Sequence, residues 1–192
     1  MSNCCDWERV QCNATAEQLK SLDLSENQFE GWHENKAYDG FKCLKQLKIL
    51  NLSWNYFNAT LLSYLNNLGS LTTLNLNWNN MGEGLKSVKQ GLTNLTNLKV
   101  LNLSGNQINN SLSSLGLKML RNLEELDLSR NGMNDSLTLL GLQNLKNFEE
   151  LIMVGNRISG SLNSLGLASL KDLKAFDLSD NEMNGSLSSS GT

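Results

Sequence analysis

Short stretches in which leucine alternates with polar residues recur along the chain at nearly constant intervals. Each stretch fits the template L-x-x-L-x-L-x-x-N-x-φ, where φ is an apolar residue. The template fits seven times, starting at Leu19, Leu47, Leu71, Leu98, Leu123, Phe148 and Leu173, so consecutive copies begin 28, 24, 27, 25, 25 and 25 residues apart. Such a period indicates a solenoid, in which similar turns of chain stack along one axis. A leucine-rich helical bundle would not explain an asparagine that returns with the same period.

The L-x-L segment of each copy, such as Leu101–Leu103, predicts a short β-strand, because alternate side chains of a strand point to the same face. Each coil would add one strand to a parallel sheet, and the leucines of each coil would be covered by its neighbours. The pattern therefore predicts an α/β solenoid, shaped as a horseshoe whose concave face is the parallel sheet.

One asparagine follows each predicted strand, where the chain must turn inward. An amide side chain has two donors and an acceptor oxygen with two lone pairs. Stacked at equal intervals, these amides can bond backbone groups that would otherwise be buried unpaired at a cost of about 1–3 kcal/mol each. We therefore predict an asparagine ladder formed by Asn27, Asn55, Asn79, Asn106, Asn131, Asn156 and Asn181.

The later part of the copies is also patterned, as in NNSLSSLGLKML and SGSLNSLGLASL. The pattern predicts a second short extended piece at the leucine that follows serine, then a turn at glycine and an irregular or 3₁₀-like return. These leucines are Leu112, Leu137, Leu162 and Leu187, and the glycines are Gly116, Gly141 and Gly166.

Composition and charge narrow the function classes. The chain has 192 residues with 40 leucines, 28 asparagines and no proline, and its net charge is −3. Lysine and arginine are scattered, so no basic stripe indicates nucleic acid. No apolar run approaches the roughly 18 residues of a membrane span. The first residues, MSNCCDWERVQC, lack the basic region and apolar core of a signal peptide.

The segments LKSLDLSENQFEG and LKAFDLSDNEMNGSL resemble the plant-specific class of leucine-rich repeats, and CCDWERVQC resembles the cysteine cap that opens such ectodomains. The resemblance covers nearly the whole chain and is greatest to the extracellular part of plant receptor-like proteins. It implies a partial cap at residues 1–18 and seven repeats at 19–192 without a C-terminal cap, so we expect a fragment or a truncated member. The family's proline after the second extended piece is missing in every copy.

The resemblance also implies a disulfide between Cys5 and Cys12. The pairing of Cys4 stays open, because it could be free or could reach Cys43. A zinc site is the weaker alternative, since C-C-x₆-C lacks the usual ligand spacing and the chain has one histidine, His33.

Glycosylation sequons support export weakly. The expected acceptors are Asn13, Asn58, Asn94, Asn109, Asn134 and Asn184. Two further sequons, at Asn51 and Asn102, lie in LNLS and are a by-product of the repeat.

Candidate ligand-binding residues lie on the predicted concave face. Trp54 and Trp78 each precede a ladder asparagine in consecutive coils, and tryptophan is enriched at binding hot spots. They form either an exposed platform or a cover over the leucines of the turn. Arg130 occupies the same position two coils later. The concave face also carries the acidic residues Glu125, Asp127 and Glu150. The glutamates form a cluster that either attracts a basic peptide or is solvated, and its members are Glu124, Glu125, Glu149 and Glu150.

The sequence favours recognition of a protein or peptide ligand, and by resemblance a cell-surface or extracellular role in plant defence or development with a co-receptor kinase as a further partner. A soluble secreted inhibitor of a cell-wall-degrading enzyme and a non-functional gene remnant are the alternatives. We expect no enzyme and no cofactor, because His33 lies in an irregular insertion and the chain has neither a phosphate-binding loop nor a kinase signature.

Overall fold

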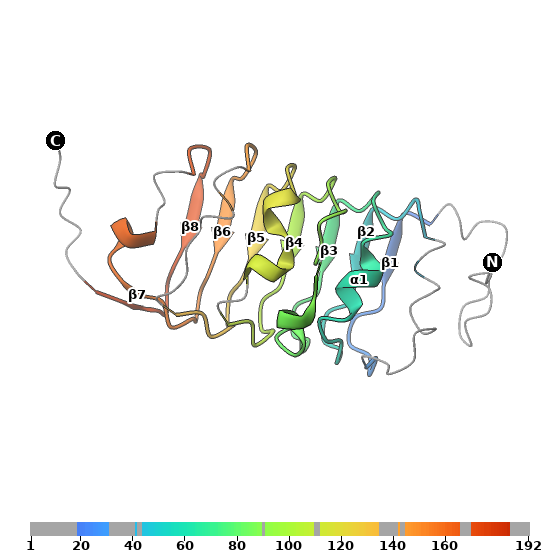
Figure 1. Ribbon diagram of the computed structural model, residues 1–192, viewed down its shortest axis with the longest axis horizontal. Coiled ribbons are helices and arrows are strands. Elements are labelled where there is room, and N and C mark those ends of the chain that lie inside the picture. The colour runs from blue at the N-terminus through green and yellow to red at the C-terminus, as the bar shows by residue number, and fades with distance from the viewer. Residues whose placement is uncertain are drawn as a thin grey trace.

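Seven short parallel strands form one sheet in the computed structural model (Figure 1), which describes residues 19–30, 41, 44–89, 91–109, 112–134, 142, 145–165 and 170–184. The strands follow one another in chain order within the sheet. They are β1 (Ser21–Asp23), β2 (Ile49–Asn51), β3 (Thr73–Asn75), β4 (Val100–Asn102), β5 (Glu125–Asp127), β6 (Glu150–Ile152) and β8 (Ala175–Asp177). The predicted solenoid with a parallel sheet is thus confirmed.

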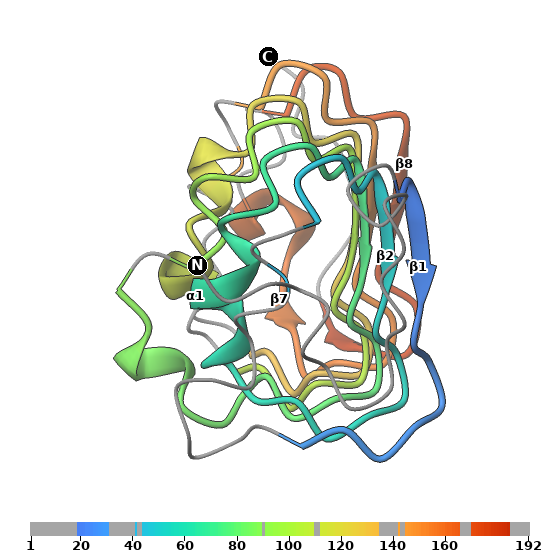
Figure 2. The ribbon, with the colours of Figure 1, turned by 90° about the vertical axis from the view of Figure 1, so that its right-hand side faces the viewer.

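The central residue of each strand points into the core. Leu50 pairs in register with Leu74, Leu74 with Leu101, and so on along the sheet. These leucines are buried while the residues on either side of them are more exposed. Since each coil covers the leucines of the next, the core is a continuous column along the solenoid axis. Seen along that axis, the coils superimpose with the sheet on one side (Figure 2).

Helical turns and short strands close the rest of each coil. The helical turns are α1 (Leu61–Leu65) and the 3₁₀ helices η4 (Leu85–Ser87), η5 (Leu112–Leu115), η6 (Leu117–Met119) and η8 (Leu162–Leu165). They lie on the side of the coils opposite the seven-stranded sheet (Figure 2). A second, two-stranded parallel sheet pairs β7 (Ser159–Gly160) with β9 (Glu182–Met183).

The prediction of an extended piece at Leu112 and Leu162 is wrong, because both leucines begin 3₁₀ helices. The second extended piece lies earlier in the coil, at β7 and β9. The predicted turn at Gly116 is present, with a φ of 73°, and a 3₁₀ return follows it. Leu137, Leu187, Gly141 and Gly166 lie outside the described residues.

The asparagines bond the backbone of neighbouring coils. Asn106 is fully buried, and its Nδ2 donates to the carbonyl oxygens of Leu76 at 2.8 Å, Leu103 at 3.0 Å and Ser104 at 3.1 Å. Its Oδ1 accepts the Met81 N–H at 3.1 Å. The same contacts, from one coil to the next, are made by Asn55, Asn79, Asn131, Asn156 and Asn181. Each asparagine thereby ties together the bends of its own and the adjacent coil.

The cap and its chemistry lie outside the described residues. This holds for Cys4, Cys5, Cys12, Cys43, His33 and Asn13, so the Cys5–Cys12 disulfide stays a prediction. In the part of the chain that the structure describes, no helix has the length and apolarity required to cross a bilayer.

Candidate functional site

The residue directly before each ladder asparagine has a left-handed backbone. We call these seven positions the turn row: Glu26, Trp54, Trp78, Gly105, Arg130, Gly155 and Asp180, whose φ angles lie between 51° and 68°. The chain takes this conformation in every coil because it must bend sharply where the strand ends. A left-handed conformation costs a residue with a Cβ about 1–2 kcal/mol, whereas glycine adopts it without strain. Only two of the seven coils have glycine at this position, so the other five bear this cost.

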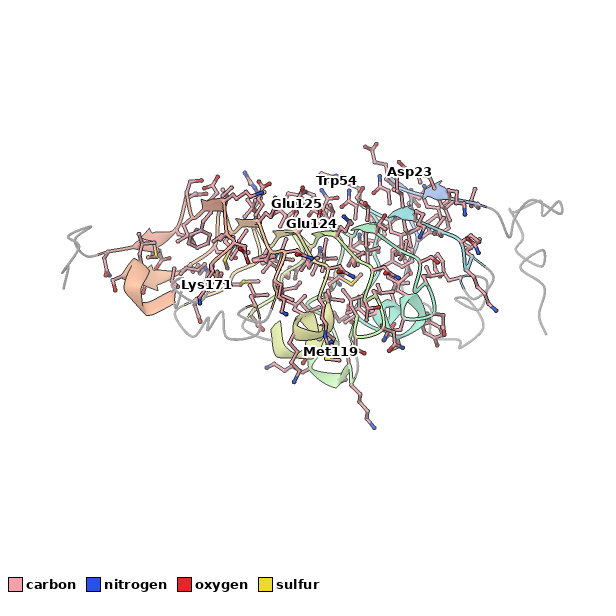
Figure 3. The ribbon with its side chains drawn as sticks, turned by 90° about the horizontal axis from the view of Figure 1, so that it is seen from above. Asp23, Trp54, Met119, Glu124, Glu125 and Lys171 are labelled. Carbon is pink, nitrogen blue, oxygen red and sulfur yellow. The ribbon has the colours of Figure 1, made fainter. Side chains whose placement is uncertain are left out.

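Trp54 and Trp78 stack on each other. Their ring centroids lie 4.9 Å apart with an angle of 18° between the planes. Trp78 in turn lies over Gly105, where a Cβ atom would come within 2.8 Å of Cδ2 of the Trp78 ring. Trp54 is 53% exposed and Trp78 is 40% exposed. The two rings therefore rest on each other and on bare backbone, and a large part of both faces solvent. Figure 3 labels Trp54.

Further apolar side chains are exposed in the coil of Trp54. Ile49, on β2, and Tyr56, just after the ladder asparagine, belong to the small set of large hydrophobic side chains that the described residues expose. This coil therefore carries three such side chains, and it forms the apolar end of the sheet face.

Arg130 repeats the arrangement of Trp78 two coils later. A Cβ on Gly155 would lie 3.2 Å from Cγ of Arg130 and 3.5 Å from Oδ2 of Asp180. Trp78 and Arg130 thus each lean along the solenoid axis over the glycine of the following coil. From Trp54 to Asp180 the row changes from aromatic to cationic to anionic, and the anionic Glu26 precedes it.

The predicted acidic cluster is partly neutralised. Glu124 pairs with Lys99 at 2.7 Å, and Glu149 pairs with Lys174 at 2.7 Å. Glu125 and Glu150 are in-register neighbours on β5 and β6 and leave two carboxylates on the sheet face. Figure 3 labels Glu124 and Glu125. The cluster is therefore a pair of acidic side chains flanked by two ion pairs.

Asp127 has a structural role that the sequence analysis missed. Its Oδ1 accepts the Ser129 N–H at 2.9 Å, which fixes the turn at the end of β5. An aspartate or asparagine makes the same bond to the residue two positions on in five other coils, at Asp23, Asn51, Asn75, Asn102 and Asp177. The signal in the sequence is the recurring D/N-L-S, since short polar side chains readily bond the backbone two residues ahead.

Two of these carboxyl groups are tuned by their hydrogen bonds. The Ser25 hydroxyl at 2.6 Å, then the Ser25 N–H and the Asn51 amide, hold the pKa of Asp23 below its usual value. The Ser179 N–H and hydroxyl do the same for the pKa of Asp177. Both carboxylates are thus favoured in their charged form by the turn that they stabilise.

Most of the expected glycan acceptors are accessible. Asn94, Asn109, Asn134 and Asn184 are exposed, and Asn58 is half-buried with its Oδ1 accepting from Thr60. Asn51 and Asn102 hold strand-end turns, which agrees with their interpretation as a by-product of the repeat. Glycosylation at the exposed positions stays a prediction.

No metal centre is evident within the described ranges: they contain no group of three or more His, Cys, Asp or Glu side chains that could hold a metal ion. The sheet face carries aromatic, amide and charged groups, which are suited to non-covalent recognition.

Two family models match the chain. One, described as "Leucine Rich repeat", matches residues 70–87, 94–111 and 120–136, and another, "Leucine Rich Repeat", matches 18–36 and 46–68. The chain is 34% identical over 145 residues to Receptor like protein 21 of Arabidopsis thaliana, covering 59% of this chain and 15% of that protein. It is 35% identical over 133 residues to Receptor-like protein 9b of the same plant, covering 55% and 14%. The chain thus spans about one seventh of the length of these relatives.

Solved structures with the same fold include plant receptors. The ectodomain of the Arabidopsis membrane receptor kinase GASSHO1/SCHENGEN3, in complex with CASPARIAN STRIP INTEGRITY FACTOR 2, superimposes with a TM-score of 0.56 at 26% identity, covering 90% of this chain and 22% of that one. The complex of PEPR1 with AtPEP1 gives a TM-score of 0.57 at 25% identity, covering 95% and 24%. Together with the seven stacked coils and the asparagine ladder, these matches show that the chain belongs to the leucine-rich-repeat proteins and is homologous to the plant receptor-like proteins.

Proposed function

We propose that this chain is a non-catalytic recognition module that binds a protein or peptide through the exposed face of its seven-stranded sheet. The observation that carries the proposal is the exposed Trp54–Trp78 stack. Tryptophan in a partly desolvated, rigid setting contributes more binding energy than other residues. Here each ring is held by its neighbour and by a fixed backbone turn, so little conformational freedom is lost when a ligand covers it.

The rest of the sheet face supports a ligand of mixed chemistry. Glu125 and Glu150 lie three and four coils beyond Trp54, with Arg130 at the edge between them. An extended ligand along the solenoid axis would meet apolar rings first and charged groups later. We propose a segment with an apolar or aromatic part and a basic part, since opposite charges steer encounter and fix register.

The relatives support the same conclusion for the whole protein. We propose a place at the plant cell surface or outside the cell, in defence or developmental signalling, with a co-receptor kinase as the second partner. The GASSHO1/SCHENGEN3 and PEPR1 structures are complexes with another molecule, and this chain corresponds to about a quarter of each receptor.

The test is a selection of random peptides on the 192-residue chain, followed by titration of the selected peptides. The variant Trp54→Gly/Trp78→Gly places in both coils the residue that the turn row already holds at Gly105 and Gly155, so the turn is kept. We expect at least about a thirtyfold loss of affinity, since a hot-spot residue contributes about 2 kcal/mol or more.

The control variant is Leu19→Ala/Leu162→Ala, which removes two exposed apolar side chains away from the turn row. It should bind the selected peptides like the wild type. Unchanged affinity in a folded Trp54→Gly/Trp78→Gly variant would remove the aromatic platform from the proposal.

A further inference from the structure

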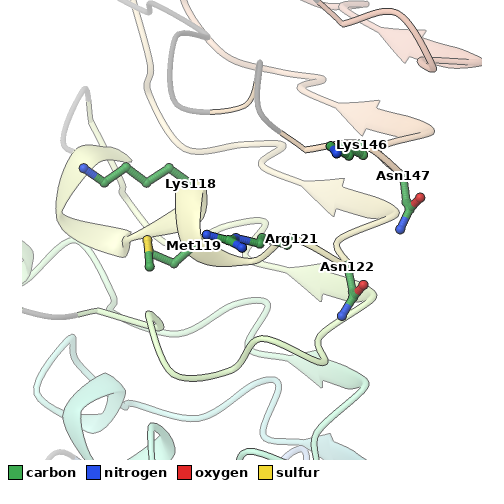
Figure 4. A pocket seen from close by; sticks show the side chains of 6 residues that line it. All are labelled: Lys118, Met119, Arg121, Asn122, Lys146 and Asn147. Carbon is green, nitrogen blue, oxygen red and sulfur yellow. The ribbon is translucent and has the colours of Figure 1, made fainter.

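A cationic pocket lies at the edge of the sheet where the strands begin. It has a cavity volume of about 600 Å³ and is formed by η6 and by the turns that precede β5 and β6 (Figure 4). The residues that line it are Lys118, Met119, Arg121, Asn122, Lys146 and Asn147. Since all strands are parallel, this edge is opposite to the edge that carries the turn row. The pocket is therefore separate from the surface proposed above.

The positive charge of this pocket is uncompensated. Three of its six lining residues are cations and none is acidic, and within the described part of the chain none of the three forms an ion pair. The carboxylates at the start of β5 and β6, Glu124 and Glu149, are occupied by Lys99 and Lys174. A group of like charges that no protein group offsets raises the local concentration of anions. The fold thus brings Lys146 close to Lys118 and Arg121, which precede it by a coil in the sequence.

The cations recur with the spacing of the coils. Arg121, Lys146 and Lys171 each stand two residues before a template start, in three successive coils. Neighbouring strands lie about 4.8 Å apart, so the backbone positions of these three residues follow one another along the solenoid axis with roughly the offset of the coils. The matching ligand is a linear chain with closely and regularly spaced anionic groups. An extended acidic peptide also carries regularly spaced anionic groups, so the experiment below includes polyglutamate to tell the two kinds of polymer apart.

Neutral groups beside the cations further restrict the chemical class of ligand that the pocket can bind. Asn122 and Asn147 stand beside Arg121 and Lys146, and Asn122 donates one N–H to the Thr96 carbonyl at 2.8 Å. An amide has a second N–H and an acceptor oxygen, which suit hydroxyl groups. Met119 adds an exposed apolar surface. None of the described residues that line the pocket is aromatic, which disfavours a single-stranded nucleic acid, because its bases are normally held by stacking.

We propose that Lys118, Arg121 and Lys146, extended by Lys171, form a binding site for a linear acidic polysaccharide with one carboxylate per sugar. The carboxylates lie along the cationic row, and the hydroxyl groups bond the amides of Asn122 and Asn147. The polymer lies along the flank of the solenoid and leaves the face with Trp54 and Trp78 open.

The experiment titrates the 192-residue chain with de-esterified polygalacturonate of defined length by calorimetry. The variant Lys118→Gln/Arg121→Gln/Lys146→Gln should lose about tenfold or more in affinity, since each exposed ion pair contributes only modestly. The control Lys20→Gln/Lys45→Gln/Lys48→Gln changes the net charge by the same amount in the first two coils and should bind like the wild type. Binding should weaken at high salt, and the methyl-esterified polymer should not bind.

Three results would overturn the proposal. The first is equal affinity of the wild type and the pocket variant for polygalacturonate. The second is an equal loss in the control variant, which would indicate attraction by overall charge alone. The third is binding of polyglutamate or of a single-stranded oligonucleotide at least as tight as that of polygalacturonate, which would assign the pocket to another class of polymer. Trp54→Gly/Trp78→Gly should leave polygalacturonate binding unchanged, so the two sites are tested independently.

Discussion

At the scale of single residues, the same template position can serve the fold or the surface. Asn106 is buried, and its amide bonds the backbone of its own coil and of the preceding coil, so its identity is set by folding. The residue before each ladder asparagine has a fixed backbone but a free choice of side chain. Of two residues adjacent in the sequence, one is therefore constrained by folding and the other is available for the binding surface.

Asn106→Ala should lower the free energy of unfolding by about 1–3 kcal/mol, because buried carbonyls and the Met81 N–H lose their partner. Urea unfolding monitored by circular dichroism measures the loss. Asn27→Ala is the matched control: Asn27 is exposed and, among the described residues, its side-chain amide donates only to Leu24 and Ser25 of its own coil, so its loss should stay below about 0.5 kcal/mol. Equal effects of the two substitutions would contradict the ladder.

Gly105→Ala should destabilise the fold by about 2–3 kcal/mol, because the left-handed backbone disfavours a Cβ and the new methyl group would strike the Trp78 ring. In a Trp78→Gly background the cost should fall to about 1–2 kcal/mol, the part due to the backbone. Gly155→Ala is the control, since its neighbour is the flexible Arg130 chain. If Gly105→Ala costs the same in both backgrounds, the ring does not rest on Gly105.

At the scale of elements, two features end the three-residue strands of the seven-stranded sheet, and six of the seven strands have both. A polar side chain at the last strand residue bonds the N–H two positions on, and the left-handed residue that follows turns the chain inward. Ile152 replaces the polar residue in β6, and Val154 stands where Ser129 and Ser179 stand in the neighbouring coils. The ladder asparagine and the left-handed Gly155 remain in that coil, and β6 keeps its register with β5 and β8.

Asp177→Asn should reduce the acid sensitivity of the fold. The pKa of Asp177 is lower in the folded chain than its usual value of 3.8, so its carboxylate stabilises the fold above that pH. That stabilisation is lost as the pH falls through the folded-state pKa. Asparagine accepts the same N–H, as Asn102 does from Ser104, but does not titrate in this range.

The measurement is the melting temperature between pH 2 and pH 7. Asp177→Asn should melt slightly below the wild type at pH 7, because its amide is a neutral acceptor, and should fall less steeply below pH 4. Asp177→Ala, which removes the acceptor, should melt earlier at every pH. A wild-type pH profile for Asp177→Asn would mean that the Ser179 bonds do not favour the carboxylate.

At the scale of the whole molecule, stability is a sum of contacts between adjacent coils. Excising residues 123–147 removes one 25-residue period and joins Asn122 to Phe148. The remaining coils should stack in the same register, with the circular dichroism per residue unchanged and a melting temperature lower by about 2–8 °C, since one interface is lost. Excising residues 123–135 breaks the period and should abolish cooperative unfolding. Equal behaviour of the two deletions would rule out a stack of equivalent coils.

The sequence predicted the features that repeat and missed those that depend on neighbouring side chains. The burial of Leu101 and Asn106 follows from their period. The sequence predicts a short extended piece at Leu112, where the structure has a 3₁₀ helix, because S-L-S-S-L-G-L fits extended alternation as well as a tight helical turn. The sequence placed Trp54 and Trp78 in one column, but not their stacking over Gly105. The pocket of Arg121 and Lys146 was missed because the template does not extend to the turn before each strand.

The left-handed turn row has one more implication. Every coil has the same left-handed backbone there whatever its side chain, and tryptophan, arginine, aspartate, glutamate and glycine all occupy the position. Exchanging these residues would alter what the molecule can hold without altering how it folds. A few substitutions in the turn row could therefore change the binding specificity of the molecule while the backbone of each coil stays the same.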